Sequence, residues 1–296
     1  MATYTNLNLA RLANAALEAF VKELAPLSAF STSYTPEAIG RAQGNVVLVP
    51  LVASLTGTTF GGTYAVCGGS KSVVTVTINR HKVVHIGQQD LDARNNSDSA
   101  LESFFRQQGA ALATTVFEDV LTLVTTANFA SAGQTTSTFL DLVQLRATKL
   151  ALDQANAPKM QRNLLVDAVG MDALLAVTNF VQAQMFKDTG VLFNGAVTHA
   201  LGFDFFQLNS SFVSANSVNC FAAQASAIAV AMRYLEPQAG NTYLNSIPVT
   251  DPTTGATFGI RDFYDNATGT RYIALECNYG YSAGLTNAGR IIKRTD

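Results

Sequence analysis

Hydrophobic residues recur at three- and four-residue steps in several parts of the chain, and this spacing predicts amphipathic helices. The first helix covers Leu9–Leu24 and is expected to end at Pro26, because proline cannot donate to the helical ladder. The clearest helix covers Ser99–Ala127 and opens with a capping box formed by Ser99 and Glu102. At about 1.5 Å per residue it is roughly 40 Å long, so we expect it to act as a spine for other elements. A further helix is predicted over Thr138–Ala155.

Alternation of apolar and polar residues predicts two strands that form a long hairpin. Asn45–Leu55 is rich in β-branched residues, and Pro50 within it requires an edge position. Ser72–Ile86 alternates and returns antiparallel. The glycine-rich run LTGTTFGGTYAVCGGSKS lies between them. Because an isolated two-stranded hairpin is marginally stable in water, we expect its stability to come from another chain.

The remaining segments predict a mixed α and β composition, so the fold class is α+β. Residues 25–45 are small, polar and punctuated by Pro and Gly, and are predicted to form an extended arm. Arg162–Asp167 is a short strand and Met171–Phe186 a helix. Cys220–Pro237 suits either a helix or a buried strand, and its alanine content favours a helix. The chain closes with a hairpin centred on Asn266–Gly269.

Composition excludes several classes of protein. The chain has 296 residues, 48% of them hydrophobic, and a net charge of −2 without any block of like charge, so the basic surface of a sequence-reading nucleic-acid binder is missing. No long apolar stretch or signal peptide is visible, and we expect neither export nor membrane insertion. The three cysteines are far apart, which argues against zinc or disulfides and fits synthesis in a reducing cytoplasm.

Motifs that carry chemistry are scarce. GGSKS at Gly68–Ser72 fails the phosphate-loop pattern and precedes a strand, and the GxGxxG, GxSxG and HExxH patterns are absent. His81 and His85 share a strand face but lie about 13 Å apart, too far to bind one metal. We therefore predict no catalytic, cofactor-binding or metal-binding residues.

Two further groups of residues have ordinary structural interpretations. The carboxylate pairs Glu118–Asp119 and Asp90 with Asp92 are expected to be solvated, since no apolar pocket is predicted near them. The alternating aromatic residues are expected to belong to the core rather than to a base-stacking surface. These are Phe203, Phe205 and Phe206.

The order of these elements resembles the major capsid proteins of tailed bacteriophages, whose fold is shared with herpesvirus capsid floors and encapsulins. Lys159–Phe180, KMQRNLLVDAVGMDALLAVTNF, is similar to the strand and helix that enter the family's axial domain. Phe193–Ser211, FNGAVTHALGFDFFQLNSS, is similar to a characteristic strand segment. The sequence from Gly259 to Arg294 resembles the closing sheet of podovirus-type coat proteins.

The resemblance implies a division of the chain into five segments. They are an N-terminal helix and arm (1–44), an extended loop with its return strand (45–96), a peripheral domain with the spine helix (97–157), an axial domain (158–258) and a C-terminal return to the peripheral sheet (259–296).

The resemblance also implies a function in assembly. Copies would form hexamers and pentamers that close into an icosahedral shell around packaged double-stranded DNA, without cofactors or membrane. The extended-loop tip would contact a neighbouring subunit through Thr59, Phe60, Gly61, Gly62 and Lys71. Implied partners are a separate scaffold protein, a portal protein and a decoration protein. The expected location is the virion, after synthesis in the cytoplasm of the host bacterium.

Three alternatives remain open at this point. An encapsulin-like compartment has the same fold but protein cargo. A carboxylate-based α/β hydrolase would be a small oligomer with a pocket acid. A tail-tube or decoration protein is disfavoured, because the long helix and the α/β centre do not suit an all-β module.

Overall fold

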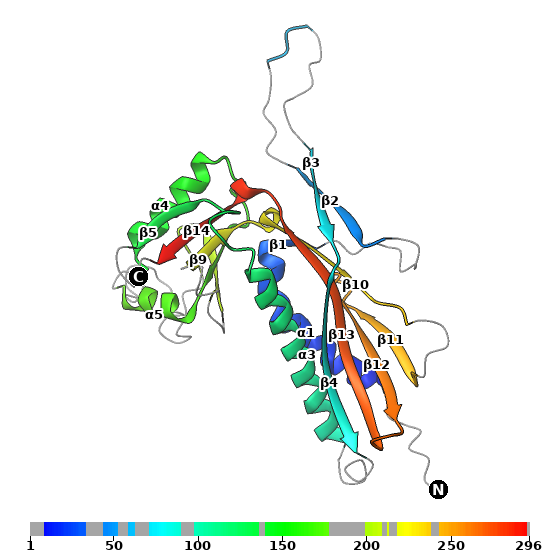
Figure 1. Cartoon of the computed structure of the whole chain (residues 1–296). Helices are drawn as coiled ribbons and strands as arrows, with labels where there is room; N and C mark the ends of the chain where they lie inside the picture. Colours follow the sequence, from blue (N-terminus) through cyan, green and yellow to red (C-terminus); the bar gives the residue numbers. More distant parts are fainter. Residues whose placement is uncertain are drawn as a thin grey trace.

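A computed structural model gives the arrangement of the helices and strands (Figure 1). The residues that it describes are 9–33, 44–52, 59–62, 71–89, 98–135, 140–177, 199–208, 212, 218–237 and 243–294.

The first sheet is built around the long strand β13 (Thr270–Ala283). One side of β13 pairs antiparallel with β12 and, further along, with β10, and the other side pairs antiparallel with β4. The other strands of this sheet are β1 (Ser31–Ser33), β4 (Arg80–Gln89), β10 (Ile228–Arg233), β11 (Asn245–Thr250) and β12 (Thr257–Asp265). The predicted C-terminal hairpin is confirmed, since β12 and β13 flank residues 266–269.

Two helices, α1 (Leu9–Phe30) and α3 (Asp98–Leu121), cover one face of this sheet (Figure 1). Their crossing is close at Gly109, where an added Cβ would lie 2.3 Å from the carbonyl oxygen of Ala16. The spine helix is therefore confirmed, although it ends at Leu121 rather than Ala127. The side chain of Ser99, and with it the predicted capping box, lies outside the described residues.

The expected end of the first helix at Pro26 is wrong. Helix α1 continues through Pro26 to Phe30 because its apolar stripe continues, with Leu24, Leu27 and Phe30 all buried in the core. Residues 31–33 then form β1, which pairs in parallel with β10. The first part of the predicted arm is thus a packed element, and residues 34–43 lie outside the described ones.

The second sheet combines strands from distant parts of the chain in the order β5-β14-β9-β6-β8-β7. Its bounds are β5 (Ser131–Thr135), β6 (Asn163–Val166), β7 (His199–Ala200), β8 (Phe203–Gln207), β9 (Val218–Ala223) and β14 (Gly289–Arg294). Helices α4 (Leu142–Gln154) and α5 (Ala168–Ala176) accompany it. Helix α4 begins with a capping box of Asp141 and Gln144. The bounds expected for the next helix, Met171–Phe186, are wrong, because α5 begins at Ala168 and ends at Ala176, where the backbone of Val177 is extended. Residues 178–198 lie outside the described ones.

The second sheet separates two hydrophobic cores. Leu165, Phe221 and Ile291 face the larger core, which also contains α1, α3 and one face of the first sheet. Leu164 and Ile292 face the smaller core under α4 and α5. The aromatic residues of β8 pack against these cores as expected. Phe203 is fully buried, and Phe205 and Phe206 are partly buried.

The helix expected over Cys220–Pro237 is also wrong. The segment forms β9 and β10, joined by a short 3-10 turn at Ala225–Ala227. Both strands are central in their sheets, and almost every side chain in them is buried. Small side chains on both faces of a buried strand overrode the helical preference of alanine.

The strands of each sheet come from several of the five predicted segments. Strands β10 and β11 join the first sheet although they follow β6 to β9 in the chain, and β14 joins the second sheet although it follows β13. The segment boundaries themselves stay a prediction.

Candidate functional site

The two strands on either side of the glycine-rich run form a hairpin that projects from the body of the molecule (Figure 1). Strands β2 (Val46–Val52) and β3 (Lys71–Thr77) pair antiparallel, with Val46 opposite Thr77 and Val52 opposite Lys71. The predicted hairpin is confirmed, with Pro50 in an edge strand. The predicted return strand is divided, however, because β3 ends at Thr77 and β4 begins at Arg80.

The inner face of the hairpin base packs on the helix-free face of the first sheet. Val47, Val49 and Leu51 of β2 are buried there with Val76 and Ile78, against Ala229 and Ala231 of β10. The expectation that the hairpin takes its stability from another chain is therefore wrong for this base. The rest of the same chain buries one of its two faces.

Four small residues form the surface under the hairpin, and we call them the platform: Ala229, Ala231, Gly280 and Gly284. A Cβ on Gly280 would lie 2.1 Å from the carbonyl oxygen of Thr77, and one on Gly284 would lie 2.9 Å from a methyl group of Leu51. The hairpin backbone approaches the sheet this closely only because the platform lacks larger side chains.

The outer face of the hairpin is apolar and exposed. Val46 is 51% exposed, Leu48 is 59% exposed and Val73 is 49% exposed. Pro50, opposite Val73, is exposed as well. Neither the sheet nor another described segment covers this strip. Only the tip was predicted to contact another subunit, although the alternation that predicted the second strand also indicates this outer face.

The structure separates the residues predicted for the loop tip. Thr59, Phe60, Gly61 and Gly62 lie at the far end of the projection (Figure 1). Phe60 is 64% exposed, and Gly62 has a φ of +88°, a conformation that favours glycine. Lys71 begins β3 opposite Val52, at the end of the paired strands nearer the tip, and its side chain lies outside the described residues.

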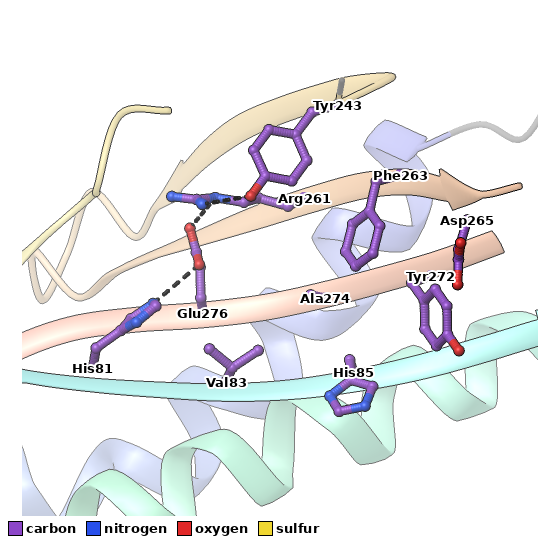
Figure 2. Close-up of a pocket in the computed structure, with 10 residues that line it drawn as sticks. All are labelled: His81, Val83, His85, Tyr243, Arg261, Phe263, Asp265, Tyr272, Ala274 and Glu276. Carbon is purple, nitrogen blue, oxygen red and sulfur yellow. Dashed lines mark hydrogen bonds and ion pairs between the residues drawn. The ribbon is translucent and has the colours of Figure 1, made fainter. Parts of the chain in front are cut away.

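A groove of about 550 Å³ opens on the same helix-free face, farther along the first sheet (Figure 2). His81, Val83 and His85 of β4 form one wall, and Arg261 and Phe263 of β12 face them. The floor is low because Ala274 lies between these walls.

A polar network closes one end of the groove. Glu276 is only 5% exposed; it forms an ion pair with Arg261 and contacts His81, whose Nε2 lies 3.0 Å from its Oε2. Arg261 also donates to the hydroxyl of Tyr243 at 3.1 Å. His85 contacts the edge of the Tyr272 ring. Both histidines thus have partners within the fold, and no group of three potential metal ligands occurs among the described residues.

The expectation of solvated carboxylates is wrong for Asp119. Its Oδ2 accepts a hydrogen bond from the Tyr279 hydroxyl at 2.6 Å and pairs with Arg80 and Lys82. Burial alone would raise the pKa of Asp119, but these hydrogen bonds and positive charges outweigh it and lower the pKa below its ordinary value. Glu118 is exposed as expected, whereas Asp90 and Asp92 lie outside the described residues.

The two cysteines in the described part of the chain are inert. Burial, together with the charge of Glu276, raises the pKa of Cys277 to about 12, and burial also raises the pKa of Cys220. Neither thiol is available as a nucleophile.

A family model described as phage capsid protein matches residues 93–240, which is half of the chain. This chain belongs to the phage capsid protein family. The capsid protein has the function of a major capsid protein, with its place in the phage virion, and family and fold indicate a structural rather than a catalytic protein. A search of curated proteins finds no match.

Solved structures with a similar fold come from several phages. A structure from Mycobacterium phage Che8 has 19% sequence identity and a TM-score of 0.57, covering 84% of this capsid protein and 85% of that chain. The capsid structure of cyanophage P-SCSP1u has 13% identity and a TM-score of 0.57, with coverages of 90% and 86%. The mature capsid of bacteriophage PhiM1 has 10% identity and a TM-score of 0.55, with coverages of 91% and 87%.

These similarities confirm the predicted fold class, and the encapsulin-like and hydrolase alternatives are not favoured. Among the described helices of the capsid protein, none combines the length and the apolar character needed to cross a membrane.

Proposed function

We propose that the capsid protein assembles as hexamers and pentamers into an icosahedral shell around double-stranded DNA, and that the hairpin contacts a neighbouring subunit. The observation that carries this proposal is the exposed apolar outer face of the hairpin, at Val46, Leu48 and Val73, on an element that projects away from its own core. Contiguous apolar surface of this kind marks an interaction site.

The energetics favour a repeated contact between copies. Complete burial of a valine or leucine side chain contributes about 1.5–3 kcal/mol, and these three side chains are about half exposed in the single subunit. Each copy in a ring would both offer a hairpin and receive one, which is a heterologous contact. A modest contribution per copy is thereby multiplied over the whole shell.

The tip would extend the same contact. Phe60 offers a large exposed side chain, while Gly61 and Gly62 leave open space, since a Cβ on either would meet no atom within 4 Å. Thr59 and Lys71 complete the proposed contact set. In the proposed domain organisation this hairpin is the extended loop, between the arm (1–44) and the peripheral domain (97–157).

A shell that assembles around DNA needs further proteins for its assembly, filling and stabilisation. We infer a separate scaffold protein, a portal protein and a decoration protein, after synthesis in the host cytoplasm. The net charge of −2 supports a container that encloses DNA without reading its sequence.

The hairpin contact is tested by replacing one exposed leucine at a time. Leu48→Gln on the hairpin is compared with Leu150→Gln on α4, because the two leucines are 59% and 58% exposed. Phe60→Gln tests the tip. We expect the Leu48 and Phe60 variants to melt like the wild type but to need about tenfold more protein to form shells, which corresponds to a loss of about 1.4 kcal/mol per subunit. Negative-stain electron microscopy and light scattering measure the shells.

The control decides the interpretation. Leu150→Gln is expected to assemble normally. Equal loss of shells in the Leu48 and Leu150 variants, or normal shells from the Leu48 variant, would contradict the hairpin contact.

A further inference from the structure

The hairpin is joined to the first sheet by a short link. Strand β3 ends at Thr77, and β4 begins at Arg80, so Ile78 and Asn79 alone connect them. Ile78 is buried in the hairpin base and donates its backbone N–H to the carbonyl of Asn45 at 2.7 Å. Contacts that hold Arg80 in place therefore also hold the point at which the hairpin joins the first sheet.

Asp119 fixes Arg80 from the helix side of the sheet. One carboxylate oxygen, Oδ2, lies 2.6 Å from the Tyr279 hydroxyl, 3.2 Å from Arg80 Nη1 and 3.6 Å from Lys82 Nζ. Tyr279 and Arg80 are cross-strand partners and so share this face. Asp119 is two residues from the end of α3 at Leu121, where the helix dipole also attracts cations.

A second contact also holds the Arg80 side chain in place. Its guanidinium lies 4.4 Å from the centre of the Tyr281 ring, within the range of a cation–π interaction. The hydroxyl of Tyr281 lies 2.9 Å from Thr122 Oγ1, just beyond the end of α3. The guanidinium is therefore fixed by a carboxylate and by a ring that is itself tied to the helix end.

The opposite face of β13 carries the hairpin itself. Gly280 lies between Tyr279 and Tyr281 in sequence and is in close contact with Thr77 on the helix-free face. The contacts between side chains on that face are apolar, so they hold the hairpin against the platform by burial rather than by directional bonds. Charge-assisted hydrogen bonds are directional, and Asp119 accepts such bonds beside the link between the hairpin and β4.

The other strand of the hairpin has a weaker fixation. Arg233 Nη1 donates to the carbonyl of Gly44, before β2, at 2.6 Å. That acceptor is a neutral carbonyl, whereas Asp119 provides a charged acceptor with two hydrogen-bond donors, Tyr279 and Arg80, and the ammonium group of Lys82 nearby.

We propose that Asp119 is a positioning residue for assembly: by fixing Arg80 it sets the direction in which the hairpin leaves the subunit and meets a neighbouring copy. This proposal rests on the proposed function, in which the hairpin forms the contact between subunits. The carboxylate acts through Arg80.

The test measures hairpin direction in the full-length, unassembled subunit. Spin labels are placed on cysteines introduced at Val73 on the hairpin and Gln107 on α3, both exposed, in a background with Cys67→Ser. Cys220 and Cys277 are buried and remain unlabelled. Double electron–electron resonance then gives the distribution of distances between the labels.

Asp119→Asn is expected to broaden this distribution, whereas Glu118→Gln, which removes a charge from the next residue of α3, leaves it narrow. Asp119→Glu keeps the carboxylate and is expected to restore it. Arg80→Gln removes the other member of the ion pair and provides the same test if the Asp119 variant fails to fold. The Arg80 side chain is 43% exposed, so its replacement leaves no buried charge without a partner.

Assembly is measured separately with unlabelled variants. If the productive direction is populated about one-tenth of the time, apparent affinity between subunits falls about tenfold. A narrow distribution in folded Asp119→Asn or in Arg80→Gln overturns the positioning role, as does an Asp119→Glu distribution as broad as that of Asp119→Asn. A broad distribution with normal shells confirms the positioning role and contradicts the hairpin contact instead.

Discussion

At the residue scale, the surroundings of Asp119 are set by partners that the fold brings together. The alternation of Val74, Val76 and Ile78 with their exposed neighbours, by contrast, was visible in the sequence and correctly predicted a strand with two faces. The environment of Asp119 was not visible, because its hydrogen-bond donor Tyr279 is 160 residues away. No local pattern distinguishes Asp119 from the solvated Glu118 beside it.

Asp119 is expected to make the subunit sensitive to acid. Because the pKa of Asp119 is lowered in the folded state, the unfolded chain takes up this proton at a higher pH than the folded chain. The contribution of the Asp119 carboxylate to the free energy of unfolding is complete above its ordinary pKa of 3.8. It is lost as the pH falls through the lower pKa of the folded state. Urea unfolding of the wild type, Asp119→Asn and Glu118→Gln between about pH 6 and pH 2.5 measures this dependence.

The Asp119→Asn variant should lose less stability across this interval than the wild type, while Glu118→Gln should follow the wild type. Parallel curves for the wild type and Asp119→Asn would show that the carboxylate contributes nothing that depends on pH. The pKa of Asp251 is also lowered, mainly by its hydrogen bond from Thr254. Its effect on the pH dependence of stability is the same in all three proteins, so it cancels in the comparison.

At the element scale, the sequence located most helices and strands but not the exceptions that tertiary packing imposes. Pro26 was expected to end α1, yet burial of Leu27 and Phe30 extends the helix past it. Alanine favoured a helix over Cys220–Pro237, yet the platform and the centres of two sheets require small residues in strands. In both cases long-range burial outweighed local propensity.

The crossing of α1 and α3 gives a prediction that runs against helix propensity. In an isolated helix, Gly109→Ala would add about 1 kcal/mol of stability. In the subunit, the new methyl group would lie 2.3 Å from the backbone oxygen of Ala16, which cannot move without moving α1. We expect Gly109→Ala to lower the free energy of unfolding by about 1–3 kcal/mol.

Ala111→Gly, at an exposed position of the same helix, is the matched control and should cost only the propensity difference of about 1 kcal/mol. Chemical denaturation followed by circular dichroism measures both variants. Stabilisation by Gly109→Ala would show that the helices separate easily at this crossing.

At the scale of the whole molecule, the order of elements led to the family, but the interleaving of the two sheets was not predictable. Strand β14 pairs in parallel with β5 and antiparallel with β9, which come from separate regions of the chain. Such pairings depend on which strand edges remain free after the rest has folded. Hydrophobic periodicity reports the face of a strand and not its neighbours.

The second sheet should make the subunit unfold as one unit, because adjacent residues of β14 belong to different cores. Ile291 is buried in the larger core and Ile292 in the smaller one, both at 0% exposure. Replacing either by alanine is expected to cost about 2–5 kcal/mol and to shift the same single thermal transition. Two transitions in calorimetry, each moved by only one variant, would contradict this.

The contact between the hairpin and the platform has a consequence for synthesis on the ribosome. The hairpin strands are complete at Thr77, whereas the platform is complete only at Gly284, roughly 200 residues later. At about 5–20 residues per second, the platform emerges some 10–40 seconds after the hairpin. During that interval both apolar faces of the hairpin lie open on every nascent chain, and on a polysome they are open beside identical hairpins. We therefore expect the nascent chain to be a substrate for chaperones during this interval, through the same valines that are proposed to contact a neighbouring copy.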